Sequence, residues 1–76
     1  MTAAPHATTP AIRLNGESRV IATGCTLGQL LRELDLDPRL IVVELNRRIL
    51  RDRHAFDEVG LQDGDVLELV HFVGGG

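Results

Sequence analysis

A single stripe of leucines constrains the fold of this chain more than any other feature. Four leucines recur at the i, i+3, i+4 and i+7 spacing of one helix face: Leu27, Leu30, Leu31 and Leu34. Thr26 precedes them as a good N-cap. Asp37-Pro38 is expected to end the helix, because the residue before a proline is pushed out of the α region. The sequence therefore predicts one helix of about three turns, in a chain whose 76 residues form a single domain.

The residues before this helix predict a β-hairpin. Ile12 and Leu14 are separated by an arginine, an alternation typical of a strand with one buried face. The pair Asn15-Gly16 follows, and it is the strongest short hairpin signal because both central residues of a type I′ turn need a positive φ. A second strand is expected at about residues 18–22.

The segments after the helix predict three further strands. These strands are expected at residues 40–45, 49–50 and 66–73, with a turn at 46–47 between the first two and the fourth strand at an edge. Residues 52–62 are predicted to be irregular, with one helical turn near 55–59. Asp63-Gly64-Asp65 is expected to form the turn before the last strand.

Alternation assigns the strand residues to the two faces of the sheet. Glu44 and Glu68 should both face water. The residues expected to point inward, toward the helix, are Ile41, Val43, Leu45, Leu67, Leu69 and His71. The residues expected to point outward are Leu40, Val42, Val66, Val70 and Phe72.

These elements predict an α+β architecture. One helix covers one face of a sheet, and the first and last strands are most economically placed side by side, parallel and central. That arrangement is the β-grasp fold, a mixed sheet of about five strands packed on one helix. The predicted organisation is a disordered leader at residues 1–10, the β-grasp domain at 11–73 and a flexible glycine tail at 74–76.

Composition and motifs disfavour several classes of protein. The formal net charge of -3 disfavours a nucleic-acid binder. No apolar run approaches the roughly 20 residues that span a bilayer, and the amino terminus lacks a secretory signal, so a cytoplasmic protein with no membrane contact is expected. The histidines have no metal-ligand spacing, and the chain is too small for a deep pocket. An enzyme, a bound cofactor and a bound metal are therefore not expected.

The three final glycines, Gly74, Gly75 and Gly76, are the most informative functional feature. Glycine loses the most backbone entropy on folding, so the tail should stay mobile, and fully extended it reaches roughly 10 Å. A tail without side chains, ending in an unhindered carboxylate, suits insertion into the active site of another protein. A frayed end or a linker remnant is the competing interpretation.

Three outward residues support docking. If the third and fifth strands are neighbours, Val42, Val70 and Phe72 form one apolar patch that leads to the tail. A contiguous exposed patch favours a docking surface. The alternative is that a loop covers the patch.

Several segments together resemble a known family. The order of elements, the segment Val-Glu-Leu-Asn at 43–46, the Asp-Gly-Asp turn at 63–65 and the ending His-Phe-Val-Gly-Gly-Gly at 71–76 are similar to the ThiS family. This family comprises the ubiquitin-like sulfur carriers of the thiamine pathway. The resemblance covers residues 11–76, and the His-Phe-Val segment favours this family over the related carriers of the molybdopterin pathway.

The resemblance implies a carrier that partner enzymes load and unload. A ThiF-like adenylyltransferase would use ATP and magnesium to convert the Gly76 carboxylate to an acyl-adenylate. A persulfide sulfur donor would then replace AMP to leave a thiocarboxylate, from which a ThiG-like thiazole synthase would take sulfur for the thiazole ring. In this interpretation the chain is a co-substrate, not an enzyme, and is monomeric when free. It docks through Gly74, Gly75, Phe72, Val70 and Val42.

The residues leave other interpretations open. The chain is alternatively a sulfur carrier of the molybdopterin or cysteine type, or a non-covalent β-grasp interaction module whose glycines are incidental. Cys25 is expected to be a turn residue, with a bond to the tail as the alternative. The arginines at 47, 48, 51 and 53 are expected to be solvated, with docking on an acidic partner as the alternative.

Overall fold

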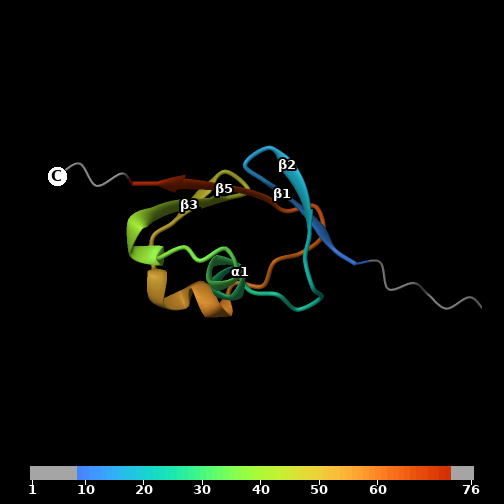
Figure 1. Ribbon diagram of the computed structural model, residues 1–76, viewed down its shortest axis with the longest axis horizontal. Helices are drawn as coiled ribbons and strands as arrows, with labels where there is room; N and C mark the ends of the chain where they lie inside the picture. The colour runs from blue at the N-terminus through green and yellow to red at the C-terminus, as the bar shows by residue number, and fades with distance from the viewer. Residues whose placement is uncertain (1–8, 73–76) are drawn as a thin grey trace, which may run out of the picture.

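The computed structural model describes residues 9–72, which form a five-stranded mixed sheet with one α-helix on one face (Figure 1). In chain order the elements are β1 (Ala11–Leu14), β2 (Glu17–Val20), α1 (Leu27–Glu33), the 3₁₀ helix η1 (Pro38–Leu40), β3 (Ile41–Leu45), β4 (Arg48–Leu50), the 3₁₀ helix η2 (Arg53–Glu58) and β5 (Val66–His71). The strand order is β2-β1-β5-β3-β4, with β1 and β5 parallel and the other neighbours antiparallel. The predicted α+β arrangement, with the first and last strands side by side, is confirmed. Residues 1–8 of the predicted leader and the predicted tail at 74–76 lie outside the described region.

Two tight turns follow from residues that adopt a positive φ. Asn15 and Gly16 have φ values of 49° and 86°, and Asn46 and Arg47 have values of 51° and 71°. Each pair joins two antiparallel strands through a two-residue loop. These are the left-handed conformations that a type I′ hairpin turn requires, so both predicted turns are confirmed.

The side chains of the two turn asparagines hold the central strand β5 from both sides. Asn15 Oδ1 accepts a hydrogen bond from the Leu69 N–H at 2.7 Å, and Asn15 Nδ2 donates to the Leu69 carbonyl at 3.2 Å. On the other side of β5, Asn46 Oδ1 accepts from the Val66 N–H at 2.9 Å. Each such bond contributes about 1 kcal/mol. The turns therefore continue the pairing of β5 where β1 and β3 end.

Helix α1 begins at the predicted cap. Thr26 Oγ1 accepts from the Gln29 N–H at 3.1 Å, and Gln29 Oε1 accepts from the Thr26 N–H at 2.9 Å. This reciprocal pair is a capping box. Leu27, Leu30 and Leu31 are almost completely buried, which stabilises the fold by about 1.5–3 kcal/mol for each side chain.

The helix ends earlier than the sequence predicts. It has seven residues, about two turns rather than three, because Asp35 adopts a φ of 59°. The Leu36 N–H then donates to the Leu31 carbonyl at 2.9 Å, and the Asp35 N–H donates to the Arg32 carbonyl at 3.1 Å. This is a Schellman ending. The predicted stop at Asp37-Pro38 was wrong, since that dipeptide instead begins η1.

The core between α1 and the sheet is mostly aliphatic, as predicted. Its buried residues are Ile12, Ile21, Cys25, Leu27, Leu30, Leu31, Ile41, Val43, Phe56, Leu61 and Leu67. The inward assignments of Ile41, Val43 and Leu67 are therefore confirmed. Gly28 allows α1 to approach η2 closely, because a Cβ at this position would collide with the carboxylate of Asp57.

Several element boundaries differ from the expectations, including β4, which starts at Arg48 instead of residue 49, and β5, which ends at His71 and leaves Phe72 outside the strand. β2 covers Glu17–Val20 instead of 18–22, and all four of its residues are exposed, so the inward residue is Ile21 just after the strand. Leu40 belongs to η1 and not to β3. The predicted helical turn at 55–59 is η2, which starts two residues earlier because the Asp52 side chain caps it.

No helix within residues 9–72 is long and apolar enough to cross a membrane.

The start of η1 contains an ion pair with a pH-dependent contribution. Asp37 Oδ2 lies 2.8 Å from Arg39 Nη2, and Asp37 Oδ1 accepts from the Arg39 N–H at 2.9 Å. The side-chain bonds from Arg39, together with this backbone bond, lower the pKa of Asp37 from 3.8 to about 2. A lowered pKa means that the carboxylate stabilises the fold above its unfolded pKa, and that this contribution is lost as the pH falls through about 2.

We therefore expect Asp37→Asn to lower the Tm at neutral pH by about 2 °C, because an exposed pair contributes little. The difference from the unmodified chain should shrink as the pH falls from about 5 toward 2. Thermal melts across this range measure it, and Arg39→Gln should show the same pH dependence. A difference that stays constant with pH would contradict the assignment.

Candidate functional site

The sheet face that points away from α1 carries several exposed hydrophobic side chains, and we call it the outer face. Alternation and register place four of them there: Val20 on β2, Ile49 on β4, and Val66 and Val70 on β5. Phe72 and Leu40 follow at the end of β5, where the Phe72 N–H donates to the Leu40 carbonyl at 2.7 Å. Figure 1 shows α1 on the opposite side of the sheet, and no element of the described chain lies over the outer face.

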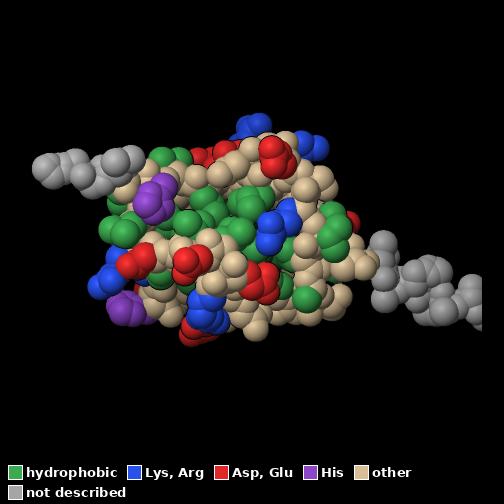
Figure 2. Space-filling view, viewed as in Figure 1, with side chains coloured by type: hydrophobic (Ala, Val, Ile, Leu, Met, Phe, Trp, Pro, Cys, Tyr) green, Lys and Arg blue, Asp and Glu red, His purple; other side chains and the backbone are tan. Residues whose placement is uncertain are grey.

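The predicted patch is assembled by the pairing of β3 with β5. The register places Val42 directly opposite Val70. Val70 is 61% exposed and Phe72 is 45% exposed, whereas Val42 is half-buried between its neighbours. Figure 2 shows some hydrophobic side chains at this end of the molecule and others along its middle. The three residues thus lie together on the outer face, and their role in docking remains a prediction.

Leu40 belongs to the same surface, although the predicted patch of Val42, Val70 and Phe72 did not contain it. Its side chain is 44% exposed, and its carbonyl is bonded to Phe72. The outward parity of Leu40 was visible in the sequence. Its position beside Phe72 depends on the register between β3 and β5, which the sequence does not contain.

His71 is exposed, and its predicted inward packing was wrong. Ile41, which lies opposite His71 in the sheet, is buried, so His71 is on the side of β5 that faces α1. The side chain of His71 is nevertheless exposed to solvent. The reason is its position at the end of β5. β1 pairs with β5 only as far as Leu14 and Leu67, so one flank of His71 has no neighbouring strand.

The glycines that carry the proposed chemistry lie outside the described residues. β5 and Phe72 lead directly to them in the chain. The roles assigned to Gly74, Gly75 and Gly76 therefore remain predictions.

Cys25 does not have the surroundings of a reactive thiol. It is 5% exposed, and its Sγ donates to the Thr26 carbonyl at 3.4 Å. Burial, and secondarily the charge of Glu33, raise the pKa of the Cys25 thiol. A raised pKa disfavours the nucleophilic thiolate, which supports a packing role.

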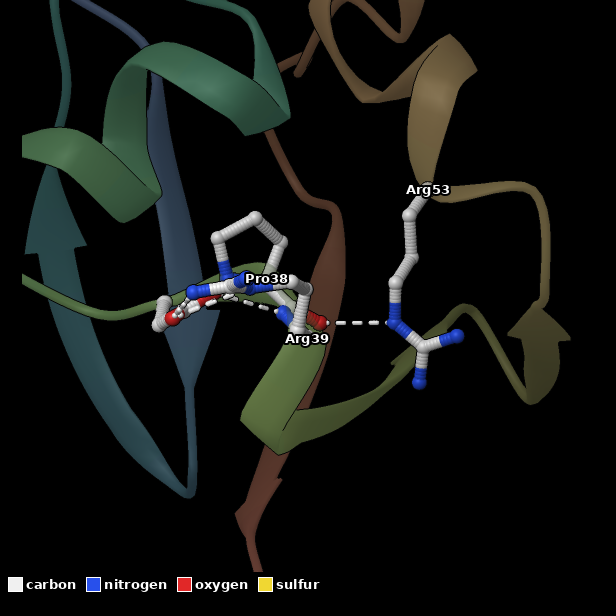
Figure 3. Close-up of polar contacts among 4 residues, drawn as sticks. Pro38, Arg39 and Arg53 are labelled. Carbon is white, nitrogen blue, oxygen red and sulfur yellow. Dashed lines mark hydrogen bonds and ion pairs between the residues drawn. The ribbon is translucent and has the colours of Figure 1, made fainter.

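Arg53 holds the segment that carries Leu40 (Figure 3). Its Nε donates to the Pro38 carbonyl at 2.7 Å, and its Nη2 donates to the Ile41 carbonyl at 3.4 Å. These two carbonyls lie on either side of Leu40. Arg53 thus joins η2 to η1 and to the start of β3. Arg47, Arg48, Arg51 and Arg53 are all exposed, as predicted, and Arg53 has this structural role in addition.

Comparisons of sequence identify relatives over most of the chain. A model of the ThiS family matches residues 12–76. A sulfur carrier protein ThiS from Bacillus subtilis is 43% identical over 51 residues, which cover 67% of this chain and 76% of that protein. Thiazole synthases from Paramagnetospirillum magneticum and Magnetococcus marinus are 41% and 42% identical over 63 and 65 residues, or 83% and 86% of this chain. This chain spans only 19% and 20% of the length of these two enzymes.

Comparison of structures gives the same result. The crystal structure of a thiamine biosynthesis protein (ThiS) from Geobacter metallireducens matches with a TM-score of 0.72 and 32% identity. The match covers 87% of this chain and 99% of that chain. A solution structure of a thiamine biosynthesis protein from the same organism matches with a TM-score of 0.70 and 33% identity, over 87% of each chain. The predicted ubiquitin-like β-grasp fold is confirmed.

The bonds of Arg53 generate a prediction about stability. We expect Arg53→Ala to lower the free energy of unfolding by about 1 kcal/mol, because two carbonyls lose a charged donor at an exposed site. Arg51→Ala is the matched control, since Arg51 is exposed and has no hydrogen bond to a described residue. Urea denaturation of both variants checks this. Equal stability of the two variants would show that the bonds of Arg53 contribute nothing.

Proposed function

The chain belongs to the ThiS family, and on that premise we propose that it is a sulfur carrier in thiamine biosynthesis. The observation that carries the proposal is a β-grasp domain whose last strand, β5, is followed after Phe72 and Val73 by Gly74-Gly75-Gly76. The Bacillus relative named as a sulfur carrier and the Geobacter relative named for thiamine biosynthesis support it.

The proposed reaction takes place on the main chain of Gly76. A carboxylate is a poor electrophile, so a partner adenylyltransferase first joins its oxygen to the α-phosphorus of ATP, with magnesium as the partner's metal and pyrophosphate as the leaving group. A persulfide on a donor protein then attacks the acyl carbon and AMP leaves. A thiol then attacks the donor's sulfur in the resulting acyl disulfide, which breaks the S–S bond, forms a new disulfide between the thiol and the donor, and leaves a thiocarboxylate on Gly76. The chain supplies no catalytic side chain and no cofactor, and acts as the co-substrate.

We propose that a thiazole synthase accepts the sulfur. Two relatives named thiazole synthase contain a segment similar to this chain within a much longer polypeptide. A carrier and an enzyme joined in one polypeptide meet at a high effective concentration. This supports a direct encounter between this chain and such an enzyme.

The outer face near Phe72 is the proposed docking surface for these partners. Leu40, Val42, Val70 and Phe72 lie at the end of the sheet from which the chain continues to the glycines. Apolar contact there removes exposed hydrophobic surface from water. Docking at this position would deliver the tail to a partner's active site.

The proposed transfer of sulfur predicts a change in the mass of the chain. Incubation with the cognate adenylyltransferase, ATP and a persulfide source should increase the intact mass by about 16 Da at Gly76, because one oxygen is replaced by one sulfur. Mass spectrometry of the whole chain and of its terminal peptide measures this gain. A variant without Gly75 and Gly76 should keep the fold and show no gain. If competent partners leave the unmodified chain unchanged, the carrier function is wrong, and retained partner binding by the truncated variant would favour a non-covalent module.

The proposed docking surface predicts an effect on the affinity for the adenylyltransferase. Val70→Glu should raise the KM for the carrier in the adenylation reaction by about tenfold, because it buries a charge in an apolar contact. Its kcat and Tm should change little, since Val70 is 61% exposed in the free chain. Val20→Glu is the matched control, because Val20 lies on the outer face at the edge strand and is 65% exposed. The surface is misassigned if both variants give the same KM.

A further inference from the structure

Strand β2 is one edge of the sheet, and half of its backbone groups point away from the fold. Just after β2, the Ile21 N–H donates to the Pro10 carbonyl at 2.9 Å. Alternate residues of an antiparallel strand bond to the same neighbour, so Glu17 and Arg19 also face β1. The N–H and C=O of Ser18 therefore point away from β1, and in the described chain no strand lies on that side. Such an edge is open to pairing with another extended strand.

The two charged residues of β2 have opposite signs and lie on the same face. Arg19 is the register partner of the buried Ile12, so its side chain is on the sheet face that carries α1, and Glu17 shares this face because it is two residues away. Both side chains are exposed, and neither forms an ion pair with a described residue. A strand with this order of charges is complementary to itself when it is read in the opposite direction.

An antiparallel copy of β2 would pair both the backbone groups and the charges. When Ser18 lies opposite Ser18 of a second copy, the N–H of each donates to the C=O of the other across a two-fold axis. In the same register Glu17 lies opposite Arg19 of the second copy, and Arg19 lies opposite its Glu17. These are positions without mutual hydrogen bonds, where the two Cα atoms are about 4.5 Å apart and the side chains are closest. Opposite charges placed in this way stabilise a sheet.

The other edge of the sheet lacks this complementarity. β4 is joined to β3 by a two-residue turn, as β2 is joined to β1, so Ile49 takes the place of Ser18 there. A copy of β4 paired about Ile49 would place Arg47 opposite Arg51 of the second copy, and like charges in this position destabilise the pairing. Charged side chains protect an exposed edge in this manner. Of the two edges, the charge pattern therefore favours β2 for pairing with a copy.

We propose that the chain forms a symmetric dimer in which the two β2 strands pair about Ser18. The two-fold axis stands perpendicular to the sheet, so both α1 helices lie on one face of a continuous sheet and both outer faces lie on the other. β1 separates β2 from β5, and Figure 1 shows β2 away from the end of β5 at which the described chain stops. The dimer thus leaves Phe72 uncovered in both copies. It differs from the monomer that the family resemblance implied for the free chain, and it does not depend on the proposed function.

The test is sedimentation equilibrium of the full chain from about 10 µM to about 1 mM, because an interface of one short strand is weak. Glu17→Arg and Arg19→Glu should each weaken dimerisation by about tenfold or more, since each variant places like charges opposite each other. An equimolar mixture of these two variants should recover the affinity as a heterodimer, because every cross-strand pair then joins opposite charges. The swapped variant Glu17→Arg/Arg19→Glu should dimerise like the unmodified chain.

A backbone variant tests the strand pairing itself. Ser18→Pro removes the outward N–H and leaves the bonds between β2 and β1, since proline is tolerated on the free side of an edge strand. Dimerisation should be lost, and the Tm at low concentration should change little. Ser18→Ala is the matched control, because it keeps the N–H and should still dimerise.

Two outcomes would overturn the proposal. One is an unmodified chain that stays monomeric at about 1 mM. The other is a dimer that survives Ser18→Pro and both charge reversals, which would assign the contact to another surface, such as the exposed hydrophobic residues of the outer face. A mixture of Glu17→Arg and Arg19→Glu that stays monomeric would likewise contradict the register. None of these variants changes Gly76, so the gain of mass tests the proposed function separately.

Discussion

The structure depends on the two-sided pairing of β5. This last strand lies between β1, which it joins in parallel, and β3, which it joins antiparallel. Where these neighbours end, the side chains of Asn15 and Asn46 continue the hydrogen bonding to its backbone. A strand at the centre of a sheet cannot open without breaking pairs on both sides. The first part of β5 is therefore anchored on both sides, whereas its last residues, from Val70, are paired with β3 alone.

The outer face is exposed because the chain has too little helix to cover both sides of the sheet. One α-helix of seven residues covers only one side of a five-stranded sheet, so the second side keeps its hydrophobic residues exposed. The same face contains Glu44 opposite Glu68, and neither carboxylate forms an ion pair with a residue in the range 9–72. The exposed hydrophobic residues are the surface on which we propose that a partner docks. The small core stabilises the fold because the side chains of Leu27, Leu30 and Leu31 are almost fully buried in it.

The elements outside the sheet position the surface. Arg53 reaches from η2 to carbonyls on both sides of Leu40, and Leu40 is bonded to Phe72. The end of β5 is thus supported by a chain of contacts that passes through η1. Cys25, in contrast, is buried with a raised pKa and takes no part in this surface.

The sequence by itself determined the features that depend on neighbours in the chain. These are the leucine face of α1 with its cap at Thr26, the two turns at Asn15 and Asn46, and the alternation that assigns Val70 outward. The family was also visible, because its short motifs are contiguous. Only the tertiary structure decided how far each element extends and what lies across from it. Helix α1 ended at Glu33 because Asp35 adopts a φ of 59°, and His71 was exposed because β1 stops short of it. The register between strands was likewise decided only by the tertiary structure. Two strands that are distant in sequence pair through backbone groups, which are the same in every residue. The position of Glu44 opposite Glu68 is therefore set by packing across the whole sheet.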